Sequence, residues 1–120
     1  MSKQQDDVTK YLSLLYDDLQ SEVTLNKITN VAGHSQIRVD IWIPCIRCVV
    51  EIHGIQHHKP SGFGKNKIET QQTFIEQLNR DSRLKKACKQ FEINYEQIDY
   101  TETVSMATLF RRFDKYDRED

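Results

Sequence analysis

The chain has 120 residues and a mass of 14.2 kDa, which fits one domain over residues 1–120. Its mean hydropathy of -0.69 predicts a well-hydrated surface, and no apolar run approaches the ~20 residues of a membrane span. Three cysteines cannot all pair with one another, and the polar N-terminus is unlike a signal peptide. We therefore expect an intracellular, cytoplasmic protein without a disulfide framework.

The net charge of -1 conceals an uneven distribution of charge along the chain. Residues 59–89 carry eight positive and three negative side chains, whereas the segments on either side are acidic. The positive residues are Lys59, Lys65, Lys67, Arg80, Arg83, Lys85, Lys86 and Lys89. Such a patch predicts a face that binds a polyanion, although a solvated helix face explains the charges alone equally well.

Hydrophobic periodicity predicts the elements of the first half of the chain. Apolar residues at three- and four-residue spacing predict an amphipathic helix over residues 5–20. Period-two alternation predicts strands over 21–28 and 37–43. A break at 44–47 and a returning strand over 48–54 complete an antiparallel hairpin.

The second half of the chain is predicted to add a loop, two helices and a strand. Proline and glycine mark residues 57–66 as an exposed loop. A helix over 68–91 would bury a stripe formed by Phe74, Ile75, Leu78, Leu84, Ala87 and Cys88. A strand over 93–100 precedes a last helix that Thr103 would cap. The order α-β-β-β-α-β-α predicts a small α/β (α+β) domain around a central antiparallel hairpin.

The hairpin is the most specific feature of the sequence. A turn centred on Cys45 and Ile46 would give the pairs Ile43–Cys48, Trp42–Val49, Asp40–Glu51 and Arg38–His53. Alternation would then gather the charged members on one face of the sheet and the apolar core on the other. Opposed carboxylates repel, but a divalent cation such as Mg²⁺ between them reverses the sign of the interaction. Asp40 and Glu51 thus predict a metal site, and a solvated sheet face is the alternative.

The motifs RVDIWIP at residues 38–44 and VVEIHGIQH at 49–57, followed by Arg80-Asp81 in a helix, resemble the PD-(D/E)XK nuclease superfamily. They are most similar to the branch of very-short-patch-repair, phage-type and homing endonucleases, over residues 5–113. The resemblance implies a restriction-endonuclease-like fold in which Asp40 and Glu51 bind Mg²⁺, which Mn²⁺ would replace. The family usually has Lys two residues after the second acid, where this chain has His53.

The resemblance also implies catalytic histidines. His53 would accept a proton or contact the scissile phosphate. The very-short-patch-repair enzymes have a catalytic histidine just after a glycine, which implies His57 or His58 here, and His57 is favoured because it completes a Gln-His pair. An acid of the first helix often completes the site, which leaves a choice among Asp6, Asp7, Asp17 and Asp18. Asp81 lies close to the apolar stripe of its helix, so it should either orient a catalytic histidine or pair with Arg38 or Arg83.

Two further residue patterns admit alternatives. Cys45 and Cys48 have the spacing of zinc ligands, but no second such pair exists, and structural roles explain them more simply. Trp42 shares the face of Asp40 and either stacks on a base or packs in the core.

The sequence therefore predicts a Mg²⁺-dependent DNA endonuclease with the catalytic residues Asp40, Glu51, His53, His57 and Asp81. Phosphates would be bound by Lys59, Lys65, Lys67, Arg80, Arg83, Lys85 and Lys86. RNA is an alternative substrate, and a homodimer or a partner protein could supply specificity. Two rival functions are a nucleic-acid-binding module with a degenerate site and a metal-free protein-interaction domain.

Overall fold

The computed structural model describes residues 3–54 and 67–117, with the backbone alone for 67–70. The chain forms four helices and four strands in these ranges, in the order α-β-α-β-β-α-β-α. They are α1 Lys3–Leu15, β1 Gln20–Thr24, α2 Asn26–Thr29, β2 Arg38–Ile43, β3 Cys48–His53, α3 Lys67–Gln90, β4 Asn94–Asp99 and α4 Met106–Asp117. The α+β class and the predicted order are confirmed, with the short helix α2 as an addition.

The strands form one mixed sheet in the order β1-β2-β3-β4. β2 is antiparallel to both β1 and β3, whereas β3 and β4 are parallel. Parallel neighbours need a long crossover, and α3 is the helix of that connection. The predicted hairpin register is confirmed where β2 and β3 pair, because Trp42 pairs with Val49 and Ile43 with Cys48.

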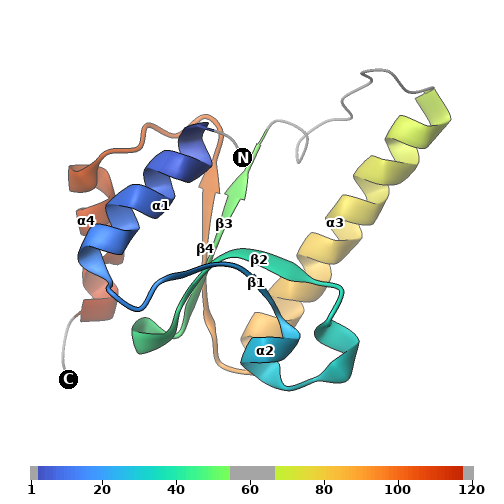
Figure 1. Ribbon diagram of the computed structural model, residues 1–120. Coiled ribbons are helices and arrows are strands. Elements are labelled where there is room, and N and C mark those ends of the chain that lie inside the picture. The colour runs from blue at the N-terminus through green and yellow to red at the C-terminus, as the bar shows by residue number, and fades with distance from the viewer. Residues whose placement is uncertain (1–2, 55–66, 118–120) are drawn as a thin grey trace.

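Helices cover both faces of the sheet (Figure 1): α1 and α4 lie on one side and α3 crosses the other. The first face buries Ile41, Val50 and Phe113 with their neighbours, and the second buries Trp42, Val49 and Leu84 with theirs. The expectation of one apolar face and one polar face is therefore wrong. Trp42 packs in the second core at 8% exposure, because α3 lies over it. The polar cluster is confined to the end of the hairpin.

The predicted buried stripe of α3 holds for only half of the helix. Leu84, Ala87 and Cys88 are buried, whereas Ile75 and Leu78 are 55% and 43% exposed and Phe74 is half-buried. A helix of 24 residues is about 36 Å long, but a six-residue strand spans only about 20 Å. The N-terminal half of α3 therefore extends past the sheet (Figure 1).

The hairpin turn and the cap of the last helix differ from the predictions. The hairpin turns through a 3-10 turn at Pro44–Ile46, which ends at Arg47 in the left-handed conformation. Helix α4 is capped by Ser105, whose Oγ accepts the backbone N–H of Thr108 at 3.1 Å, and not by Thr103. No helix in the described ranges has both the length and the apolar character needed to cross a bilayer.

Candidate active site

Asp40 and Glu51 meet where the β2–β3 ladder ends. The backbone pairing of β2 with β3 stops at Ile41 and Val50. Farther from the turn, the carboxylates of Asp40 and Glu51 accept hydrogen bonds from backbone N–H groups of the facing strand. The backbone N–H of Asp40 donates to Glu51 Oε2 at 2.7 Å. The N–H of Ile52 donates to Asp40 Oδ2 at 2.9 Å. The predicted opposition of Asp40 and Glu51 is thus present, and each bond uses one of the two oxygens of its carboxylate.

Glu51 is held in an unfavourable electrostatic environment. It is 7% exposed on the central strand β3. Burial, together with the charges of Asp40 and then Asp81, raises the pKa of Glu51 to about 8, although the N–H of Asp40 and the charge of Arg80 partly oppose this. A cation in the adjacent space would offset the repulsion by Asp40 and Asp81 and favour the ionised form of Glu51.

A cavity of about 270 Å³ opens beside the pair. Asp40 and Glu51 line it together with a stripe of α3 at helical spacing, formed by Gln77, Arg80, Asp81 and Leu84. From α1 it receives Gln5, and none of the four predicted candidate acids is among its described lining residues. Asp17 and Asp18 lie beyond the end of α1 at Leu15. Asp18 lies elsewhere, where its Oδ2 accepts the backbone N–H of Cys45 at 2.7 Å.

Asp81 lies on α3, the helix that covers the face of the sheet from which Glu51 and His53 project. One ligand atom of each of these three residues lies within 4.8 Å of the other two. Of the two arginines considered as partners for Asp81, Arg38 lies 3.9 Å from Glu22 and also lines the cavity with Asp81, and Arg83 donates to the carbonyl of Gly33. The structure places Asp81 beside His53, and whether it orients this histidine stays a prediction.

The expected pairing of Arg38 with His53 is wrong. Arg38 pairs with Thr24 of β1, and His53 pairs with Asp99 of the parallel strand β4. The reason is that the backbone pairing of β2 with β3 starts at the turn and ends at Ile41 and Val50, so it does not reach Arg38 and His53. His53 is only 4% exposed, and its predicted role in proton transfer stays a prediction.

A second cavity of about 380 Å³ lies on the other side of Asp81. Its lining combines His53 and Asp81 with Lys85 and Lys86, and it is completed by Leu78, Ser82 and Gln97. Lys85 also lies 5.7 Å from the centre of the Tyr95 ring. Two of the predicted phosphate-binding lysines thus border the carboxylate–histidine cluster.

The other predicted residues divide into two groups. Arg80 lines the first cavity, whereas Arg83 is directed toward the turn at Gly33. His57, Lys59 and Lys65 lie outside the described residues, as does the side chain of Lys67. Cys45 is exposed, and among the described residues neither it nor Cys48 belongs to a convergent set of metal ligands.

Sequence reasoning missed a second charged cluster on the opposite face of the sheet. Glu96 of β4 is 6% exposed and binds Arg112 and Lys115 of α4, each at 2.8 Å, as well as the hydroxyl of Tyr116. Burial favours the neutral acid, but the hydrogen bonds from these three partners outweigh it and lower the pKa of Glu96. The signal available was the spacing of Arg112 and Lys115, three residues apart on one helix.

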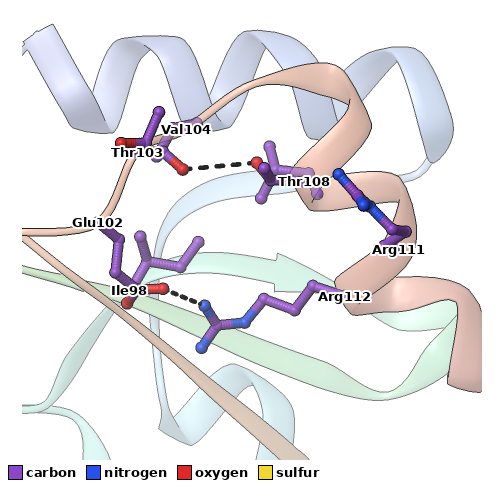
Figure 2. A pocket seen from close by; sticks show the side chains of 8 residues that line it. Ile98, Glu102, Thr103, Val104, Thr108, Arg111 and Arg112 are labelled. Carbon is purple, nitrogen blue, oxygen red and sulfur yellow. Dashed lines mark hydrogen bonds and ion pairs between the residues drawn. The ribbon is translucent and has the colours of Figure 1, made fainter.

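A cavity of about 540 Å³ lies near the start of α4, and neither Asp40 nor Glu51 lines it. Figure 2 shows the Arg112 side chain extending to Glu102, and the two are 2.6 Å apart. In the same view the hydroxyl of Thr108 donates a hydrogen bond to the backbone carbonyl of Thr103. Because Arg112 is already ion-paired, this cavity lacks the convergent reactive groups of the cluster around Glu51.

Comparison of the chain with protein-family models, curated proteins and solved structures gives no match. The resemblance to PD-(D/E)XK nucleases therefore stays a prediction from the sequence motifs.

Proposed function

We propose that the protein is a Mg²⁺-dependent endonuclease that hydrolyses phosphodiester bonds of DNA. The observation that carries the proposal is the meeting of Asp40 and Glu51 in one cavity beneath the basic helix α3. Two carboxylates in such proximity, one of them buried, are a costly arrangement for an apo protein. A divalent cation with a phosphate beside it makes the arrangement favourable.

The donor set fits Mg²⁺, which prefers one or two carboxylates completed by water and phosphate oxygens. Asp40 and Glu51 supply such oxygens, and the cavity of about 270 Å³ has room for further ligands. When bound, the ion supplies Lewis acidity for a water and for the leaving oxygen. The chain fixes the two carboxylates through the N–H groups of Asp40 and Ile52.

The basic residues of α3 suit the binding of a phosphate backbone. Arg80 borders the cavity of the carboxylates, and Lys85 and Lys86 border the adjoining one. Side chains in these places would contact successive phosphates and position the duplex without reading its sequence. The same chemistry serves RNA, so the assay includes both polymers.

The decisive experiment is a cleavage assay on supercoiled, linear, mismatched and branched DNA and on RNA, with Mg²⁺ or Mn²⁺. We expect metal-dependent cleavage of DNA by the wild type and none by Asp40→Asn or Glu51→Gln. Asp17→Asn, which alters an exposed acid outside the cavity, is the matched control and should cleave normally. Cleavage by both site variants at the wild-type rate would overturn the proposal. Metal-dependent DNA binding without any cleavage would instead support the degenerate binding module.

A further inference from the structure

The cluster beside the carboxylate pair contains a nitrogen ligand as well as oxygen ligands. Glu51 and His53 are two residues apart on β3, so their side chains project from the same face of the sheet. Asp81 reaches them from α3, and one ligand atom of each residue lies within 4.8 Å of the others. Among the residues that the structure describes, no other set of three His, Cys, Asp or Glu side chains converges in this way.

The spacing of these atoms is close to that of an ion site. Bonds of about 2.1 Å place two ligand atoms at most about 4.2 Å apart across an ion. Small side-chain rotations would therefore bring the three groups onto one ion. Asp81 borders both the 270 Å³ and the 380 Å³ cavities, so there is space on either side of it for additional water ligands.

We propose that Glu51, His53 and Asp81 form a second ion position, which binds a divalent transition-metal ion such as Mn²⁺ in preference to Mg²⁺. Imidazole suits transition-metal ions, whereas Mg²⁺ favours sites made only of oxygen. Glu51 belongs to both positions, and its two carboxylate oxygens allow it to bridge them. The inference deepens the proposed function through this shared residue, but the ligand set stands on its own geometry.

The proposal gives His53 and Asp81 different roles from those predicted from the sequence. A ring nitrogen bound to an ion does not accept a proton from water, so His53 becomes a ligand. Asp81 becomes a ligand as well, and does not merely orient the histidine. The two interpretations of Asp81 differ in a measurable way. If Asp81 orients a histidine that transfers protons and binds no ion, its replacement leaves ion affinity unchanged, whereas replacement of a ligand of the ion weakens ion binding.

Mn²⁺ itself is the probe, and electron paramagnetic resonance on the full chain is the measurement. Titration gives the amount and affinity of bound Mn²⁺, and pulsed spectra detect a nitrogen coupled to the ion. We expect nitrogen coupling in the wild type, in Asp40→Asn and in the control His34→Gln, which removes a histidine bonded to Thr29. The coupling should vanish in His53→Gln. Asp81→Asn should weaken binding of the nitrogen-coupled ion by roughly tenfold or more, because a charged ligand is replaced by a neutral amide.

Three results would overturn the proposal: no nitrogen coupling in the wild type, coupling that persists in His53→Gln, or wild-type affinity in Asp81→Asn. Circular dichroism of each variant establishes that the fold is retained. Failure of the proposed function is separable, because an inactive protein with the expected nitrogen coupling would keep the ion position and reject the nuclease. Competition with excess Mg²⁺ should displace the nitrogen-coupled Mn²⁺ less readily than the Mn²⁺ bound through Asp40, and equal displacement would refute the selectivity.

Discussion

The backbone nitrogen of Asp40 lies 2.7 Å from the carboxylate of Glu51, in place of a ladder bond between their strands. This bond fixes Glu51 while the charge of Asp40 and burial disfavour its ionised form. The hydrogen bond therefore positions the acid and partly lowers its pKa, but burial and the charge of Asp40 outweigh it and keep the pKa high.

Without metal, the wild type should lose stability as the pH rises from about 5 to about 8. Unfolded Glu51 releases its proton near its ordinary pKa of 4.5, whereas in the folded chain the pKa is about 8. The folded state therefore binds more protons in this interval, and stability falls with pH. Glu51→Gln keeps an acceptor for Asp40 and should remove most of this slope, which urea unfolding in the presence of a chelator would show. Glu76→Gln, an exposed acid of α3, should leave the slope unchanged.

Metal binding should tighten over the same pH interval, because a proton on Glu51 competes with the ion. Calorimetric titration with Mg²⁺ in buffers of different ionisation enthalpy should detect proton release in the wild type and little in Glu51→Gln. At a metal concentration of 100 times Kd, the ion should stabilise the fold by about 2.7 kcal/mol. Equal affinity near pH 6 and pH 8 would contradict the role of Glu51 as a ligand.

Charge reversal at Lys85 and Lys86 should weaken DNA binding about equally for all sequences. Both lysines border the 380 Å³ cavity, where a phosphate would be bound without base contacts. The salt dependence of binding should flatten by roughly one unit of slope for each phosphate that the variant no longer neutralises. Lys89→Glu, on the same helix but in neither of these two cavities, is the control. An unchanged slope in the double variant would place the binding surface elsewhere.

Glu96→Gln should destabilise the fold by about 1.5–3 kcal/mol, the range for the loss of hydrogen bonds to a charged group. Glu96 is buried, but Lys115 is largely exposed and Arg112 keeps its ion pair with Glu102, so the loss should stay below that of a fully buried ion pair. Since the pKa of Glu96 is lowered, its contribution is present above the ordinary pKa of the acid and disappears as the pH falls through the folded value. Urea unfolding at neutral and acidic pH would measure this, and a variant as stable as the wild type at neutral pH would refute it.

The sequence predicted the register of the hairpin because alternation and a single turn leave few choices. Trp42 and Val49 pair as expected. It could not predict that both faces of the sheet are covered, because coverage depends on how α3 crosses the strands. Trp42 was expected on the same face as Asp40, and that pattern is compatible with either a polar or an apolar face. In the structure α3 packs over Trp42 and leaves it 8% exposed.

The candidate site was predictable in part for the same reason. Asp40 and Glu51 are local to one hairpin, so their opposition follows from pairing alone. The approach of Asp81 to His53 joins a strand to a helix about 30 positions later, and no periodicity fixes such a distance. The Glu96–Arg112 cluster likewise joins β4 to α4, and depends on how α4 packs against the sheet.

The unequal support of α3 has a consequence for motion. From Leu84 onward the helix packs in the core that contains Trp42 and Val49, whereas Ile75 and Leu78 are exposed to solvent. The turns before Asp81 therefore depend mainly on their own backbone hydrogen bonds, which open more often than those of a packed helix. Amide protons there should exchange with solvent faster than those of Ala87 and Cys88. Asp81 lies at the boundary, so ligation of Asp81 would spread protection toward the start of the helix.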